Sequence, residues 1–166
     1  GHEYAKKAVE LGAAVIFTQE KIGVDNEIVV PDTRELYADM CAKWFGNPAD
    51  SLKLIGVTGT NGKTSITYML KSILEAVGYK VGLIGTIESK VGDKTLRTSA
   101  NTTPDAVELQ ELFAHMANEK VDAVVMEVSS HALDLKRVYG SEFDIGLFTN
   151  LSQDHLDYHK DFETYF

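Results

Sequence analysis

A short glycine-rich segment with a lysine and a threonine carries the clearest chemistry in this sequence. It reads Gly-Val-Thr-Gly-Thr-Asn-Gly-Lys-Thr over residues 56–64, after the apolar pair at 54–55 and before a strongly helical pattern. A strand, a glycine-rich turn and a helix N-terminus together bind polyphosphate, because backbone N–H groups and the helix dipole both favour negative charge. Lys63 would reach the terminal phosphates, and the Thr64 hydroxyl would bind Mg²⁺. The glycine spacing is a variant, since Val57 stands where the usual motif has its first glycine.

Two further polar segments follow apolar, strand-like runs. In the first, Glu127 interrupts such a run. A carboxylate there is costly unless it is paired or binds a cation, so a salt bridge and a Mg²⁺ ligand are the two interpretations, and the phosphate loop favours Mg²⁺. The second, residues 149–159, contains His155 and His159 at helical i,i+4 spacing. No partner cysteine or His-Glu-x-x-His pattern supports zinc, so a magnesium site using His155 is the better interpretation.

The elements around the loop predict a βαβ unit. Residues 54–58 read as its first strand and 81–84 as its second, with a helix between them that stops at Gly78. Six apolar side chains of that helix recur at helical spacing and are predicted to face a sheet: Ile66, Met69, Leu70, Ile73, Leu74 and Val77. The expected fold is α/β, a mostly parallel P-loop-type sheet flanked by helices. Ligands bind such sheets beyond the carboxyl ends of the strands, so the three polar segments should meet at one edge.

Downstream, residues 86–98 predict a β-hairpin inserted into this frame. Thr103 and Pro104 then occupy the expected N-cap and first position of a helix. An apolar stripe on that helix is predicted to be buried: Leu109, Leu112, Phe113 and Met116. Long apolar runs at 121–128 and 143–151 predict two more strands.

The N-terminal fifty residues predict a small α/β unit without a catalytic motif. Apolar runs at 13–17 and 28–30 are suited to short buried strands. Asp32 has the spacing of a helix N-cap, and Leu36 and Met40 are predicted on the inner face of the helix that follows.

The composition bounds the class of protein. A formal charge of −9 over 166 residues argues against nucleic acid as a bulk partner, although it does not argue against nucleotides. No run approaches the roughly 18 apolar residues of a membrane span. The single cysteine, Cys41, excludes an internal disulfide and predicts a buried thiol in a cytoplasmic protein. Turn residues over 47–51 predict a boundary between residues 1–50 and 51–166.

Four motifs occur together in the order and rough spacing of the Mur ligases. They are Thr-Gly-Thr-Asn-Gly-Lys-Thr at 58–64, Asn-Thr-Thr-Pro at 101–104, Glu-Val-Ser-Ser-His-Ala-Leu at 127–133, and Thr-Asn-Leu-Ser-Gln-Asp-His-Leu-Asp-Tyr-His at 149–159. The chain therefore resembles the Mur ligase family over residues 54–159. It is most similar to the members that add the third amino acid of the peptidoglycan stem peptide.

The resemblance implies a three-domain enzyme of which this chain holds a part. Residues 1–50 would be the C-terminal part of the UDP-sugar-binding N-terminal domain, and 51–166 the first part of the ATP-binding central domain. The sequence begins without a Met, so a piece of a longer protein is expected, inactive as a ligase alone. The family also uses a carbamylated lysine, which should fall shortly after Phe166, and Lys160 is not its equivalent.

The resemblance also implies roles for individual residues. The ATP site would be formed by Gly59, Thr60, Asn61, Gly62, Lys63, Thr64 and Ser65. The Mg²⁺ ligands would be Thr64, Glu127 and His155, and the catalytic residues Lys63, Glu127 and His155. The UDP-muramoyl-peptide would be contacted by Asn101, Thr102, Thr103, Ser129 and Arg137. Leu135 departs from the family, since many relatives have a glutamine there that contributes a substrate hydrogen bond.

The implied reaction joins a diamino acid, meso-diaminopimelate or lysine, to a UDP-muramoyl-dipeptide with ATP and Mg²⁺, through an acyl phosphate. A monomeric, cytoplasmic enzyme of peptidoglycan biosynthesis is expected. Two alternatives stay open: a ligase like folylpolyglutamate synthetase, or a P-loop kinase acting on a small-molecule hydroxyl. Folylpolyglutamate synthetases usually have Gly-Ser after the loop lysine, whereas Thr64-Ser65 follows it here and favours the Mur ligases.

Overall fold

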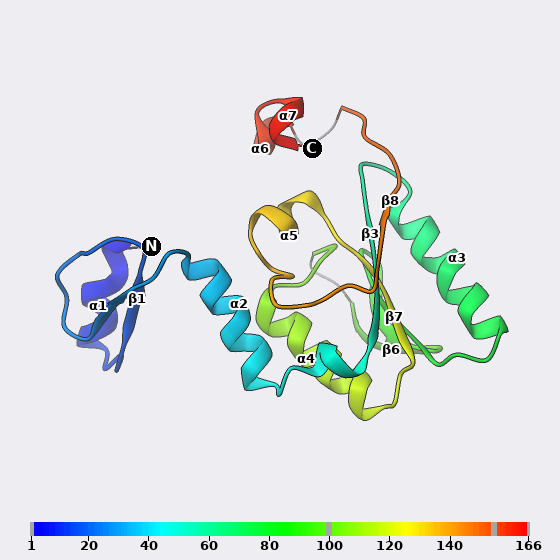
Figure 1. Ribbon diagram of the computed structural model, residues 1–166, viewed down its shortest axis with the longest axis horizontal. Coiled ribbons are helices and arrows are strands. Elements are labelled where there is room, and N and C mark those ends of the chain that lie inside the picture. The colour runs from blue at the N-terminus through cyan, green and yellow to red at the C-terminus, as the bar shows by residue number, and fades with distance from the viewer. Residues whose placement is uncertain (1, 99–100, 154–155, 166) are drawn as a thin grey trace.

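The computed structural model describes residues 2–98, 101–153 and 156–165, and its centre is a six-stranded sheet (Figure 1). The strands lie in the order β6-β5-β4-β7-β3-β8. Their bounds are β3 Lys53–Thr58, β4 Val81–Ile84, β5 Glu88–Val91, β6 Lys94–Thr98, β7 Ala123–Glu127 and β8 Ile145–Phe148. Strands β4, β7, β3 and β8 are parallel neighbours, and β5 and β6 add the antiparallel hairpin predicted from the sequence. The predicted α/β fold with a mostly parallel sheet is confirmed.

Strands β3 and β4 follow each other in the chain but are not neighbours, because β7 lies between them. Alternate side chains of these strands face opposite sides of the sheet, as the two-residue strand period requires. The side chains on one face of the sheet pack against α4 (Ala106–Asn118), and those on the other face pack against α3 (Lys63–Ala76). Figure 1 shows α3 on one side of the sheet and α4 and α5 (Ser130–Asp134) on the other. Strand β7 is buried along its whole length, so Glu127 ends a strand covered on both faces.

The predicted inner stripe of α3 is half wrong. Met69, Ile73 and Val77 are exposed, whereas the most deeply buried residues of the helix are Thr67 and Lys71. The other half of the stripe, Ile66, Leu70 and Leu74, packs on the sheet as predicted, and the first turn of the helix also forms a hydrogen bond from the Thr64 hydroxyl to Glu127. Positions three and seven residues after Thr64 then face inward as well. The Lys71 ammonium is satisfied there by both carboxylate oxygens of Glu75, at 2.7 Å.

Helix α2 (Thr33–Trp44) begins at the predicted cap, with the Asp32 carboxylate accepting from the N–H groups of Arg34 and Glu35. The predicted inner face was wrong, because Met40 is half exposed and Leu36 only partly buried. Small side chains are buried instead, where α2 packs on α4: Ala38, Cys41 and Ala42. Cys41 is the buried thiol predicted from the sequence, and burial raises its pKa.

The remaining N-terminal elements form a small unit with its own two-stranded sheet. They are η1 His2–Tyr4, α1 Ala5–Glu10, β1 Ile16–Thr18 and β2 Glu27–Val29, with β1 and β2 parallel. The strands fall where predicted, but Phe17, Ile28 and Val29 are exposed rather than buried. A two-stranded sheet with one short helix has too little chain to cover both faces.

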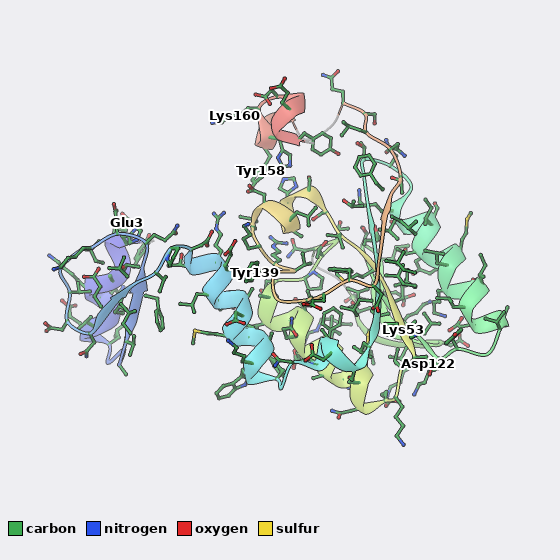
Figure 2. The ribbon with its side chains drawn as sticks, viewed as in Figure 1. Glu3, Lys53, Asp122, Tyr139, Tyr158 and Lys160 are labelled. Carbon is green, nitrogen blue, oxygen red and sulfur yellow. The ribbon has the colours of Figure 1, made fainter. Side chains whose placement is uncertain are left out.

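The other elements are η2 Pro48–Ser51, α6 Leu156–His159 and α7 Phe162–Tyr165. The predicted stripe of α4 is confirmed, with all four side chains buried. Figure 2 shows Lys53 and Asp122, which begin β3 and precede β7, at the end of the sheet far from Tyr158 and Lys160. The carboxyl ends of the strands therefore face the C-terminal helices. No helix among the described residues has the length and apolar character needed to cross a membrane.

Candidate nucleotide and metal site

The phosphate loop and the segment after β8 are joined by a dense set of hydrogen bonds. The backbone N–H of Thr60 donates to the Asn150 carbonyl at 2.9 Å, and that of Asn61 donates to the Asn150 side chain at 3.1 Å. The Asn61 carbonyl accepts in return from the side chains of Thr149 and Asn150. Two loop amides are therefore already occupied. The N-terminus of α3, which begins at Lys63, is the part of the loop suited to a phosphate, because the first N–H groups of a helix have no partner within the helix.

The Thr60 side chain also connects the phosphate loop to the segment after β8. It is buried, and its hydroxyl accepts from the Ser152 N–H at 3.0 Å and donates to the Ser152 carbonyl at 3.2 Å. The same hydroxyl shares a hydrogen bond of 2.8 Å with the hydroxyl of Tyr165 in α7. The Thr60 hydroxyl thus holds the loop to the chain after β8, and the side chain and the N–H of Thr60 are both engaged within the protein.

The variant glycine spacing has an explanation in the packing. Val57 belongs to β3, is fully buried, and pairs in register with Glu127 of β7, so it is a core residue and not part of the loop. Gly59 has φ +119, and a Cβ there would lie 2.3 Å from the Thr149 hydroxyl oxygen. The loop glycine is therefore required by the close approach of the segment after β8.

Lys63 and Thr64 lie in the first turn of α3. The Lys63 ammonium donates to the carbonyls of Gly59 and Thr60 at 2.7 and 2.9 Å, inside the loop. The Thr64 hydroxyl donates to Glu127 Oε2 at 2.9 Å. The loop and the buried carboxylate, 63 residues apart in sequence, are thus brought together at one edge of the sheet, as the strand-end argument predicts.

Among the described residues, only neutral donors form hydrogen bonds to the Glu127 carboxylate. It is 1% exposed, and besides Thr64 it accepts from the Thr86 N–H at 2.9 Å and from the Thr86 hydroxyl at 3.0 Å. A Cβ on Gly85 would lie 2.2 Å from Glu127 Oε1, so the absence of a side chain at residue 85 leaves room for the carboxylate. No lysine or arginine in the described ranges forms an ion pair with this carboxylate.

These groups fit a magnesium ion. One carboxylate and two hydroxyls supply hard oxygen atoms, the donors that Mg²⁺ prefers, and a single carboxylate suits an ion that keeps waters and phosphate oxygens. The described residues contain no cluster of three or more His, Cys, Asp or Glu able to enclose a metal by themselves. His155, the third predicted ligand, lies outside the described residues.

The predicted acceptor residues gather beside Glu127. The Thr103 hydroxyl donates to the Glu127 carbonyl at 2.9 Å and accepts from the Ser129 N–H at 2.9 Å. The Arg137 guanidinium donates to the Thr103 carbonyl at 2.9 Å. The Thr102 and Thr86 hydroxyls share a hydrogen bond of 3.1 Å, and Asn101 is exposed. Hydrogen bonds thus connect Thr103 with Ser129 and Arg137, and Asn101 and Thr102 directly precede Thr103 in the chain.

The predicted N-cap at Thr103 is wrong. Helix α4 begins at Ala106, and its cap is Asp105, whose carboxylate accepts from the Glu108 N–H at 3.1 Å. The Thr103 hydroxyl cannot cap the helix because it is committed to Glu127 and Ser129.

Sequence reasoning missed two contributors to the site: Thr86, which touches Glu127, and Tyr165, which touches the loop. Thr86 follows β4, so the strand-end rule that selected Glu127 could also have found it.

The C-terminal helices also contact α5. Tyr158 donates to Asp134 at 2.6 Å, a bond that raises the pKa of its hydroxyl, and buried His159 shares a 2.9 Å bond with Ser130 (Figure 2).

Residues 57–166 match the Mur ligase middle domain, so the chain belongs to the Mur ligase family. Its similar relatives include UDP-N-acetylmuramoyl-L-alanyl-D-glutamate--2,6-diaminopimelate ligase 1 of Clostridium acetobutylicum, 54% identical over 169 residues. The corresponding ligase of Clostridium botulinum is 54% identical over 172 residues. Each match covers 100% of this chain but 35% of the relative, so the chain spans about a third of their length.

Solved structures agree on the fold. A UDP-N-acetylmuramoyl-L-alanyl-D-glutamate--2,6-diaminopimelate ligase superposes with a TM-score of 0.80 at 31% identity, over 99% of this chain and 33% of that one. A folylpolyglutamate synthase of Mycobacterium tuberculosis, complexed with ADP and AMPPCP, has a TM-score of 0.61 at 21% identity, over 75% of this chain and 35% of that one. At that identity the second likeness concerns the fold alone.

Proposed function

We propose that the protein containing this chain is a UDP-N-acetylmuramoyl-tripeptide synthetase. It would use ATP to join a diamino acid to UDP-N-acetylmuramoyl-L-alanyl-D-glutamate through an acyl phosphate. The observation that carries the proposal is the buried Glu127 carboxylate, hydrogen-bonded to Thr64 of the phosphate loop and paired with no cation of the described chain. The names of relatives at 54% identity support the acceptor.

In this proposal the nucleotide phosphates lie over residues 59–65, at the N–H groups that begin α3. Lys63 leaves the loop carbonyls to contact the terminal phosphates, a short movement within one turn. Thr64, Glu127 and His155 would hold Mg²⁺, which supplies charge neutralisation on the phosphate oxygens when bound. Because the acceptor carboxylate and the γ-phosphate are both anions, positioning and charge stabilisation are the main tasks of these residues.

The bonds made and broken follow from that arrangement. An acceptor carboxylate oxygen attacks the γ-phosphorus, and ADP leaves. The amine of the diamino acid then attacks the acyl carbon, and inorganic phosphate leaves as the amide forms. Thr102, Ser129 and Arg137 would position the acceptor, and Thr103 would hold them in place beside Glu127.

We further propose 2,6-diaminopimelate as the incoming amino acid, in preference to lysine. The names of the similar relatives support this choice. The domain division at residue 50, a cytoplasmic location and a monomeric state remain part of the proposal, and the single buried cysteine is consistent with a reducing compartment. Since the chain spans about a third of its relatives, we expect it to be inactive alone.

The test measures phosphate release by the full-length protein with ATP and Mg²⁺ while the acceptor is varied. Release should require both the UDP-muramoyl-dipeptide and diaminopimelate. Phosphate release with a folate and glutamate would instead favour the folylpolyglutamate synthetase alternative. Formation of ADP and a phosphate ester from an alcohol, without phosphate release, would favour the kinase alternative. Lys63→Ala tests the loop itself. It should abolish ATP binding or turnover, because it removes the loop's cation for the terminal phosphates. Circular dichroism should show that this variant stays folded.

A further inference from the structure

A cavity of about 330 Å³ lies between the first turn of α2, the start of α4 and the turn after α5. It is lined by three basic side chains, Arg34, Lys136 and Arg137, beside apolar atoms of Tyr37 and Leu135. None of the residues lining it belongs to the phosphate loop. Its volume is in the range of ligand-binding clefts, about 300–1,000 Å³.

The turn after α5 directs two of these basic side chains. Lys136 has φ +58, a left-handed conformation that costs a residue with a Cβ about 1 kcal/mol. The N–H groups of Lys136 and Arg137 return to the carbonyls of Leu133 and Ala132, which is the Schellman arrangement that ends a helix. The chain reverses there, and the Arg137 guanidinium reaches the Thr103 carbonyl ahead of α4.

The acidic residues around the cavity are already committed. Lys136 is paired with Glu35 at 3.0 Å. Asp32 and Asp105 accept from backbone N–H groups at the starts of α2 and α4, so both helix ends are capped. Within the described part of the chain, the guanidiniums of Arg34 and Arg137 form no ion pair with a carboxylate. Two arginines that are not held in an ion pair with a described carboxylate therefore face one cavity, with Asp105 in its lining and Asp32 close enough to interact with Arg34.

Arg34 also lines a second cavity, of about 460 Å³, on the other side of α2. That cavity is formed with the N-terminal unit, by residues that include His2 and Phe17. Arg34 thus stands where two cavities meet, one facing the N-terminal unit and one facing Arg137. Arg137 in turn is linked to the reaction site through Thr103 and the Glu127 carbonyl. A ligand long enough to occupy both cavities would pass Arg34.

We propose that Arg34 binds an anionic group of the acceptor, phosphate or carboxylate, in the cavity that it shares with Arg137. The inference rests on the proposed function, because a UDP-muramoyl-dipeptide has the required length and carries a diphosphate and peptide carboxylates. A guanidinium suits either group, since its planar N–H donors match two oxygen atoms at once. Arg34 would be a binding residue contributed from outside the matched middle-domain region, residues 57–166.

The experiment compares the full-length wild type with Arg34→Ala, Arg34→Lys and the control Arg97→Ala. Arg97 is a half-exposed arginine on β6, paired with Glu108 and Glu111 away from the cavity. Loss of a hydrogen-bonded charge from a binding site typically weakens affinity about 10- to 100-fold. We expect Arg34→Ala to raise the acceptor KM by that factor, with kcat and the ATP KM within about twofold of wild type. Arg34→Lys should fall between the two, and Arg97→Ala should match wild type.

Calorimetric binding identifies the anionic group and separates this inference from the proposed function. A loss of affinity confined to UDP-N-acetylglucosamine indicates the diphosphate, and a loss confined to muramoyl-dipeptide indicates a carboxylate. If the wild type bound the UDP-muramoyl-dipeptide but formed no amide, the proposed function would fail, and the weaker binding of Arg34→Ala would still support this site. Equal acceptor binding by Arg34→Ala and Arg97→Ala, or no binding by any form, would overturn it.

Discussion

Two carboxylates lie beside the carboxyl end of strand β4, and their surroundings differ. Glu88 begins the hairpin strand β5 and accepts from Lys90 at 2.7 Å, from Thr95 at 2.5 Å and from Tyr68 at 3.1 Å. Glu127 ends the buried strand β7 and accepts only from hydroxyls and one backbone N–H. One carboxylate has a cation supplied by the chain itself, and the other has none within the described residues.

The difference separates a carboxylate that is neutralised within the protein from one that we propose as a metal ligand. The hydrogen bond from Lys90, with those from Thr95 and Tyr68, lowers the pKa of Glu88 from 4.5 to about 2. Its charge is neutralised whether or not a ligand is bound. Glu127 is more deeply buried, beside the glycine-rich loop, and the described residues supply no cation to it. A buried carboxylate with only neutral donors therefore indicates a cation site better than burial or acidity alone.

The largest effect should come from Glu127→Gln. Removing the negative charge from the metal site should lower turnover by about a thousandfold, roughly 4 kcal/mol of lost stabilisation. Binding of Mn²⁺, followed by electron paramagnetic resonance in place of Mg²⁺, should weaken in parallel. The melting temperature should not fall, because a buried amide costs less than a buried carboxylate. Normal turnover in this variant would remove the carboxylate from the mechanism.

Thr86→Val should have the next largest effect. The substitution removes one hydrogen bond to Glu127 and one to Thr102 but keeps the Thr86 N–H bond. Losing such a support for a metal ligand typically costs 10- to 100-fold in metal affinity. We expect the Mg²⁺ concentration for half-maximal turnover to rise by about that factor, and Thr86→Ser to behave like wild type. An unchanged Mg²⁺ dependence would mean that Thr86 does not support the site.

Glu88→Gln should affect stability and leave turnover within a few-fold of wild type. Because folding lowers the pKa of Glu88, its stabilisation is complete above about pH 4.5 and is lost as the pH falls toward 2. Allowing for contact with solvent, the loss at pH 7 should be about 1–2 kcal/mol. In urea titrations, the gap between variant and wild type should narrow between pH 7 and pH 3. A constant gap would show that Lys90 does not stabilise the charged form.

Much of this site could be predicted from the sequence because strand ends in a parallel sheet converge. The loop, Glu127 and the segment after β8 each follow a strong apolar run, so one rule placed all three at the same edge. The buried face of α4 could also be predicted from the sequence, because its four large apolar side chains lie on one side of the helix.

Side-chain contacts decided what the pattern could not. The buried positions of α3 include the polar residues Thr67 and Lys71, which a hydrophobic pattern cannot identify, whereas Met69 is exposed. The inner face of α2 is made of small side chains because α4 approaches closely, and hydrophobicity alone favours the larger Met40. Arg34 lies about a hundred residues from Arg137 in sequence, and no local pattern connects them.

The most direct test of the central claim follows oxygen through the reaction. The full-length protein would be given ATP, Mg²⁺, diaminopimelate and a UDP-muramoyl-dipeptide labelled with ¹⁸O in its carboxylates. If the acceptor carboxylate attacks the γ-phosphorus and the amine then displaces phosphate, each phosphate released should carry one ¹⁸O atom. Unlabelled phosphate accompanying amide formation would contradict the acyl phosphate, and with it the roles given to Lys63 and Glu127.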